Sequence, residues 1–360
     1  MKTVVNTREL KKALNRMTFD KKLFDKDICL TAETGTFTIE ASTITRGTKE
    51  TIKANTTEPG FIWVDAEDFI EAVKSLKAKE AELYTEGGYL VIKTDTAQHK
   101  ISFKNSGYIP KFELLESNKA VLSSSEFLTG LEKLTHIIPK KHGTNFQIDN
   151  LLLNFLGRNL EMVAINGFIL GMYRVSHSGD LKGKYLIPRE DINFIKKALS
   201  KNEVLEIYTY QEPNNKANIK LIFKTGNYIL SVLAPVYIHY PEIEGLFLNK
   251  KDITLTAKLE TETIKKIIKE LIDTEPNEKK PIIFNFSNKK LIISNEAGYS
   301  YTLETETDKE LKIAFNGNYL TDIIKPIDTK IFEIDIINKD LQAEIRTNAP
   351  YKALISPMNI

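Results

Sequence analysis

Apolar residues recur along this chain at the i, i+3, i+4, i+7 spacing that places one stripe on one face of a helix. The stripe is clear in "FNGNYLTDIIKPI", where its first member is Leu320. It begins again at five earlier positions: Leu10, Phe69, Phe127, Ile192 and Ile264. The six leading positions follow one another at intervals of 56 to 72 residues. The sequence therefore predicts the same amphipathic helix six times.

Each predicted helix is followed by segments that alternate between apolar and polar residues around a tight turn. The turns read "ETGT", "EGGY", "LGRN", "TGNY", "SNKK" and "INKD", in which Gly and Asn supply the positive φ that short hairpins need. The repeating unit is thus one helix and several antiparallel strands in ~60 residues.

A unit of ~60 residues is marginal as an independent domain, so two units are expected to share one core. This grouping predicts three domains, at residues 1–118, 119–249 and 250–360. The alternative is that a helix followed by a hairpin recurs by chance, as it can in any α+β protein.

Composition narrows the class of protein but not its function. The 360 residues include 50 basic and 48 acidic side chains and are 42% hydrophobic, which is typical of soluble globular proteins. No apolar stretch approaches the ~18 residues that span a bilayer, and "MKTVVNTREL" lacks the apolar core of a signal peptide. The sole cysteine, Cys29, excludes an intramolecular disulfide and reads either as a core residue or as a reactive thiol. We expect a cytoplasmic protein.

The chain lacks the usual signatures of catalysis. Its five histidines are scattered, and neither HExxH nor a GxxxxGK[ST] or GxGxxG loop is present. Carboxylates cluster in "DAEDFIE" and "ETETDKE", where a helix N-terminus and a solvated loop account for them. A metal-dependent nuclease built from these acids remains an alternative, but we predict no catalytic residue, no metal and no cofactor.

An ordered set of motifs resembles the bacterial DNA polymerase III β subunits, the replicative sliding clamps. "LEMVAINGFILGMYRV" followed by "YLIPREDINFIKKAL" is similar to their VATDGHRLA and PRK-x-x-x-EL segments. "YPEIEGL", "IAFNGNYLTDII" and "YKALISPMNI" stand where that family has FPDY, FN-x-x-YL-x-D and a tail of the MPMRL type. The resemblance covers roughly the whole chain.

The resemblance implies an α+β DNA-clamp fold, in which three repeated domains each carry two helices packed on antiparallel sheets. It also implies a homodimer, closed head to tail around double-stranded DNA, whose inner wall is helical. Such a ring tethers the replicative polymerase to DNA without chemistry of its own, as a non-catalytic subunit of a DNA polymerase holoenzyme. The clamp loader and other proteins would dock through QLxLF-like peptides.

By this resemblance, basic and aromatic residues of the inner helices and nearby loops contact phosphates without reading sequence. These residues are Arg8, Lys11, Lys12, Lys21, Lys22, Lys140, Lys141, His142, Phe146, Arg189, Lys196 and Lys197. The competing interpretation of the lysines is a solvated helix face.

The resemblance also implies a peptide pocket between the middle and last domains. Its walls would be Ile148, Ile165, Gly167, Leu170, Pro241, Leu246, Asn316, Tyr319, Leu354, Pro357, Met358 and Ile360. Core packing is the alternative for most of them. Phe168 and Ile169 replace the family's His-Arg pair, and Gly245 replaces an arginine, so the pocket should be more apolar and less basic.

The implied dimer interface joins Leu271 and Ile272 of the fifth helix to His99 and Ile101 near the edge of the first domain. Internal core packing is the alternative for Leu271 and Ile272. The runner-up function is a clamp-like monomeric interaction module without a ring. The departures from the family pattern make a bacteriophage, plasmid-borne or accessory clamp plausible.

Overall fold

The computed structural model describes residues 1–17, 27–107, 114, 118–139, 148–212, 215–235, 240–243 and 245–359. Each of the six predicted stripes is a helix, which confirms the repeat. The helices are α1 (Thr7–Arg16), α2 (Ala66–Ser75), α3 (Ser124–Leu134), α4 (Arg189–Ala198), α5 (Thr261–Thr274) and α6 (Gly317–Ile324). All six leading residues of the stripes are fully buried. A 3₁₀ turn spans Lys250–Asp252.

Side chains from the preceding strands fix where several helices begin. Asn6, Asp65 and Asn316 each accept hydrogen bonds from the first free backbone N–H groups of α1, α2 and α6. Glu260 does the same for α5. These groups have no partner inside their own helix, so a polar residue at the end of each strand stabilises the helix that follows.

By the density of residue contacts, the chain divides into two compact units. The first unit comprises residues 1–128, 177–181 and 190–237, and the second comprises 129–176, 182–189 and 238–360. The division passes through the predicted middle domain because its sheets continue into those of its neighbours. The three domain boundaries therefore remain a prediction.

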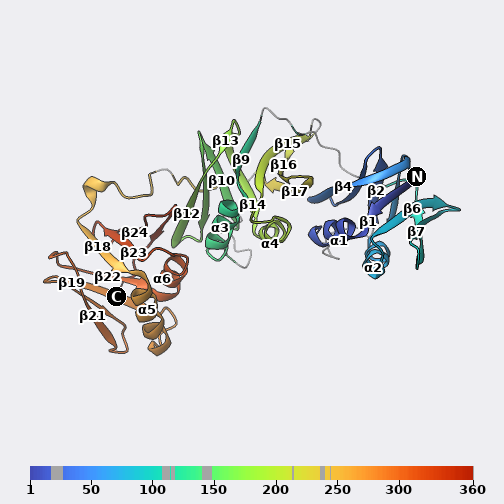
Figure 1. Ribbon diagram of the computed structural model, residues 1–360. Helices are drawn as coiled ribbons and strands as arrows, with labels where there is room; N and C mark the ends of the chain where they lie inside the picture. The colour runs from blue at the N-terminus through green and yellow to red at the C-terminus, as the bar shows by residue number, and fades with distance from the viewer. Residues whose placement is uncertain are drawn as a thin grey trace. The chain divides into compact units, whose positions relative to one another are not determined.

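In the first unit the described strands form one antiparallel sheet, with α1 and α2 side by side on one of its faces (Figure 1). Its order is β1-β6-β7-β8-β5-β2-β3-β4-β17-β16-β15-β9-β13. The bounds are β1 (Lys2–Asn6), β2 (Asp27–Glu33), β3 (Thr36–Ser42), β4 (Arg46–Glu58), β5 (Gly60–Asp65), β6 (Glu80–Glu86), β7 (Tyr89–Lys93), β8 (Gln98–Lys104), β9 (Lys119–Ser123), β13 (Ser178–Gly179), β15 (Val204–Glu212), β16 (Asn215–Thr225) and β17 (Tyr228–Pro235).

The described strands of the second unit form two antiparallel sheets, ordered β14-β10-β11-β12-β25-β24-β23-β18 and β21-β20-β19-β22. The bounds are β10 (Asn150–Leu156), β11 (Asn159–Ile165), β12 (Ile169–Ser176), β14 (Gly183–Pro188), β18 (Leu255–Glu260), β19 (Pro281–Ser287), β20 (Lys290–Ser294), β21 (Ser300–Glu304), β22 (Leu311–Asn316), β23 (Ile331–Ile336), β24 (Ala343–Arg346) and β25 (Tyr351–Ile355).

Two strand pairs join sequence-distant repeats into continuous sheets, and we call them sheet joints. In the first joint β4 pairs with β17, and in the second β12 pairs with β25. Backbone hydrogen bonds across each joint leave no open edge there. None of the described helices is long and apolar enough to cross a membrane.

Candidate functional site

An apolar surface site lies at the second sheet joint. Leu170 of β12 and Leu354 of β25 face each other across the joint, and both are buried. Ile243, from the segment between β17 and β18, packs into the same cluster. Four half-buried side chains surround it: Ile165, Tyr240, Leu246 and Phe247. Because these four keep part of their surface in water, the cluster offers an apolar surface to a ligand.

The tip of the β11–β12 hairpin carries the most exposed apolar group of this site. The Asn166 side chain accepts hydrogen bonds from the backbone N–H groups of Phe168 and Ile169, both at 3.0 Å. Gly167 adopts φ +91°, a conformation that favours glycine. This turn holds Phe168 outward, 56% exposed.

Phe168 stacks on Tyr319 of α6, with ring centroids 5.1 Å apart and planes 15° from parallel. Tyr319 is held at the start of α6, where its backbone N–H donates to the Asn316 side chain at 3.3 Å. The two stacked rings form one aromatic surface beside the apolar cluster. Aromatic surfaces of this kind bind partners well because they lose little conformational entropy.

The segment that follows β25 runs between the hairpin and β22. The backbone N–H of Ser356 donates to the carbonyl of Phe168 at 2.9 Å, and that of Met358 donates to Ala314 at 2.8 Å. Pro357 and Met358 are consequently fixed there and half-buried. The structure thus brings most of the predicted pocket residues to one place within the second unit.

Three further pocket residues were predicted from the resemblance. Pro241 is half-buried in the segment that covers the sheet, next to Tyr240, whose hydroxyl donates to the Val163 carbonyl at 3.2 Å. Ile148 is half-buried just before β10. Ile360 lies outside the described residues. Phe168 was not predicted, although an aromatic residue following Asn-Gly at a hairpin tip could have indicated it.

One cation flanks the apolar site. The Lys352 ammonium lies 3.3 Å from the centroid of the Phe247 ring, on the face of β25 that residues 240–243 and 245–248 cover. Burial lowers the pKa of Lys352, although Glu344 nearby acts in the opposite direction. Glu344 also accepts a hydrogen bond from the Leu248 N–H at 2.8 Å. These contacts hold the covering segment against the sheet.

Two of the predicted DNA contacts are already engaged within the protein. The Lys11 ammonium donates to the Leu76 carbonyl at the end of α2, at 2.6 Å. Arg189 donates from one nitrogen to the carbonyls of Thr135, at 2.9 Å, and Ile138, just after α3. Burial lowers the pKa of Arg189. Both cations stabilise free carbonyl groups at helix C-termini.

The other described basic residues among the predicted DNA contacts have side chains that reach water. Arg8, Lys12 and Lys197 are exposed and Lys196 is half-buried. Six predicted contacts lie outside the described residues: Lys21, Lys22, Lys140, Lys141, His142 and Phe146.

A groove between α5 and α6, of about 520 Å³, was not predicted. Lys265, Lys269 and Lys325 line it above apolar side chains of both helices.

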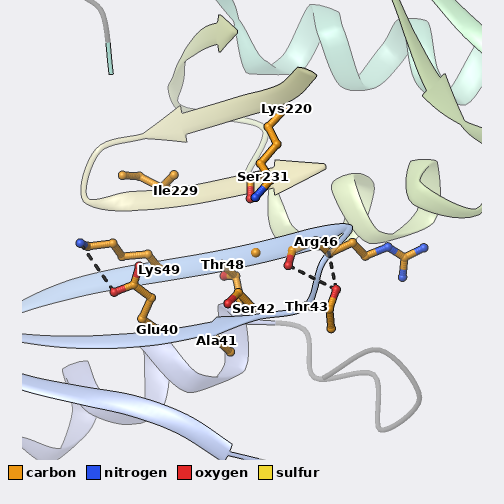
Figure 2. A pocket seen from close by; sticks show the side chains of 11 residues that line it. Glu40, Ala41, Ser42, Thr43, Arg46, Thr48, Lys49, Lys220, Ile229 and Ser231 are labelled. Atoms are coloured by element: carbon orange, nitrogen blue, oxygen red, sulfur yellow. Dashed lines mark hydrogen bonds and ion pairs between the residues drawn. The ribbon is translucent and has the colours of Figure 1, made fainter. Parts of the chain in front are cut away.

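The first sheet joint is closed by polar groups instead of an open apolar surface (Figure 2). Buried Arg46, at the start of β4, forms an ion pair with buried Asp191 of α4 and lies over the Phe194 ring, 5.2 Å from its centroid. Burial raises the pKa of Asp191 to about 6, against the opposing effect of Arg46. The cavity beside Ser42 and Ser231 measures only about 10 Å³, so it has room for a water molecule and no ligand.

A second polar cluster lies behind that joint. The Arg16 guanidinium donates to Glu203 at 2.5 Å, lies 3.8 Å from Glu50 and stacks over the Tyr228 ring. Burial raises the pKa of Glu50 to about 7, because Arg16 only partly offsets the loss of water. Arg16 also donates to the Ala198 carbonyl at the end of α4, at 3.4 Å.

Of the four predicted dimer residues, two lie on β8 and two lie on α5. His99 is half-buried on β8, with its Nε2 2.9 Å from the Ser75 hydroxyl, and Ile101 is 5% exposed on the same strand. Ile272 is half-buried at the groove between α5 and α6. Leu271 is fully buried inside the second unit, as its core interpretation predicts, so it offers no surface to another subunit. Across the described ranges, no three His, Cys, Asp or Glu side chains gather closely enough to hold a metal ion.

No protein-family model matches the sequence, and no curated protein matches it. Solved structures do match over 100% of both chains. The DNA polymerase III subunit β of Pseudomonas aeruginosa has a TM-score of 0.81 at 16% identity, and the pol III β of Caulobacter crescentus 0.80 at 16%. The Helicobacter pylori β clamp bound to a DNA ligase peptide has a TM-score of 0.77 at 16%. The chain therefore has the β-clamp fold, and the resemblance seen in its sequence is confirmed at the level of the fold.

Proposed function

We propose that this protein is a cytoplasmic DNA sliding clamp without catalytic activity. Two copies would close head to tail around duplex DNA. The observation that carries the proposal is the pair of sheet joints, which link successive repeats through backbone hydrogen bonds. Among the described strands, β21 pairs with β20 alone and β8 meets β5 only at its last two residues, so both have backbone groups left for a further strand. A ring suits this arrangement because β21 of each copy would pair with β8 of the next, which leaves no open sheet edge at either strand.

The apolar site at the second sheet joint supports a docking role for the clamp. Its leucines, its half-buried rim and the Phe168–Tyr319 pair suit a short peptide with apolar and aromatic anchors. The H. pylori relative is described with a DNA ligase peptide bound. We propose that peptides of the replicative polymerase, the clamp loader and repair proteins bind here.

Sequence-independent DNA contacts would come from the exposed cations of the helices. Arg8, Lys12 and Lys197 are suited to this role, whereas Lys11 and Arg189 have carbonyl partners within the protein. Long cations that touch phosphates without base contacts bind weakly and permit sliding.

Threading onto linear DNA tests the ring directly. One duplex is prepared with free ends, and the same duplex carries streptavidin on biotin at both ends. A preformed ring enters only over a free end, so retention on the open duplex should exceed retention on the blocked duplex several-fold at moderate salt. A monomeric interaction module would bind both duplexes equally, and degradation of either with added magnesium would indicate the nuclease alternative.

A further inference from the structure

The groove between α5 and α6 is held at both ends by contacts within the second unit, where the two helices pack side by side (Figure 1). At one end, a Cβ atom on Gly317, the first residue of α6, would stand 2.8 Å from the Ile272 side chain, so glycine permits a close approach of the helices. At the other end, the Lys265 ammonium donates to the Ile327 carbonyl, just after α6, at 2.8 Å. The helices therefore run in opposite directions, with the groove of about 520 Å³ along them.

The residues that line the groove follow the helical repeat on both helices. On α5 they stand at positions i, i+3, i+4 and i+7 counted from Lys265, and on α6 at the same four positions counted from Asn318. This spacing places them on one face of each helix over two turns, or about 10 Å. A groove between two such faces accepts a further amphipathic helix lengthwise.

The groove is apolar between the helices and cationic at its edges. Ile268 and Ile324 are buried in it, and Ile272 is half-buried. Lys269 of α5 and Lys325 of α6 are exposed, and neither has an ion-pair partner within the described ranges. An occupant can therefore cover apolar side chains and neutralise two lysines at once.

Two polar residues complete the lining. The Oγ1 atom of Thr321 is buried and has no hydrogen-bond partner among the residues that the structure describes. An unpaired hydroxyl of this kind costs free energy that an acceptor oxygen on a bound ligand would recover. Asp322 is the one acid among the described lining residues, against three lysines, so the groove carries net positive charge.

We propose that this groove binds an acidic amphipathic helix of a partner protein. The apolar stripe of that helix would lie on Ile268, Ile272 and Ile324, and its carboxylates would lie beside Lys269 and Lys325. Charge complementarity favours this occupant, and duplex DNA fits less well because its phosphates and sugars would leave the isoleucines uncovered. The groove belongs to one copy of the chain, so the proposal goes beyond the ring and does not depend on its closure.

Fluorescence anisotropy with a labelled peptide tests the proposal. The peptide has about 15 residues, with leucines at the i, i+3, i+4, i+7 spacing and glutamates on the flanking positions. A scrambled peptide of the same composition lacks the stripe, and a third peptide carries lysine in place of each glutamate. We expect the acidic amphipathic peptide to bind roughly tenfold more tightly than either of the others, and less tightly as salt is added.

Charge reversal on the protein makes the test independent of damage to the fold. Lys269→Glu combined with Lys325→Glu should weaken the acidic peptide roughly tenfold, since an exposed charge pair contributes a factor of about two to five. The same variant should bind the lysine peptide more tightly than the unaltered protein does. Lys266→Glu combined with Lys312→Glu is the matched control, because it makes the same change in net charge at exposed residues outside the groove. Phe168→Ala, at the second sheet joint, should also leave the acidic peptide bound.

Three outcomes would overturn the proposal. The first is equal binding of the acidic and scrambled peptides, or an equal loss in the two double variants. The second is a loss of binding in Phe168→Ala alone, which would place the peptide at the second sheet joint. The third is weaker duplex binding in Lys269→Glu with Lys325→Glu while the unaltered protein binds no peptide, which would assign the two lysines to DNA.

Discussion

Glu50 gives a quantitative test of the polar cluster behind the first sheet joint. Its side chain is 12% exposed, and the nearest Arg16 nitrogen is 3.8 Å from its Oε2. Within the described part of the chain Oε2 has no hydrogen-bond partner. Burial therefore raises the pKa of Glu50 from 4.5 to about 7. We predict that Glu50→Gln stabilises the protein at alkaline pH.

The sign and size of this change in the free energy of unfolding follow from proton linkage. Between pH 4.5 and 7 the folded protein keeps a proton on Glu50 that the unfolded chain releases, so the free energy of unfolding falls as pH rises through this window. Each pKa unit corresponds to about 1.4 kcal/mol, so the ionised carboxylate costs about 3 kcal/mol above pH 7. Glutamine has nearly the same shape and no charge, so it avoids this cost.

Urea unfolding between pH 4.5 and 8.5 measures the effect. The gain in unfolding free energy for Glu50→Gln should approach about 3 kcal/mol at pH 8 and shrink towards zero near pH 4.5. Glu33→Gln, an exposed carboxylate of the same sheet, should show no such trend. A destabilised Glu50→Gln at pH 8, or a difference that does not change with pH, would refute the reasoning.

Two further predictions concern cations that have partners within the protein. Arg46→Met leaves the buried Asp191 carboxylate without its charged partner, so the free energy of unfolding should fall by about 3–5 kcal/mol, whereas Arg46→Met with Asp191→Leu should recover most of it; equal losses in both variants would contradict this. Lys11→Met should destabilise the protein and Lys12→Met should not, while Lys12→Met alone should weaken duplex binding and reduce its salt slope by about one. Loss of DNA binding in a fully stable Lys11→Met would reverse the two roles.

Sequence periodicity predicted the helices well, because burial of a stripe depends on local spacing. All six stripe leaders are fully buried, and the positive-φ turn at Gly167 also follows from local residue type. The grouping of repeats into compact units depends instead on long-range strand pairing. Nothing in the sequence near β4 or β17 indicates that the two strands pair, so the pattern could not reveal how the units divide.

The partners of individual side chains were harder to predict from the sequence than the positions of the helices. Lys11 and Lys12 are adjacent lysines on one helix, yet one donates to a carbonyl at the end of α2 and the other is exposed. Only the packing of α1 against α2 distinguishes them. The residues of the apolar site were named together because they came as a set from the family resemblance, and their role in binding stays a prediction. Phe168 was missed because it departs from that family's pattern.

The two sheet joints show why one repeat produces a docking site and its counterpart does not. Counting from the stripe leaders, Asp191 in α4 and Tyr319 in α6 occupy equivalent positions, each one residue before the leader. At the first joint the hairpin supplies Arg46, and the ion pair with Asp191 is buried. At the second joint the hairpin supplies Phe168, which stacks on Tyr319 and remains exposed. One position thus closes a joint when it is charged and offers an aromatic surface when it is not.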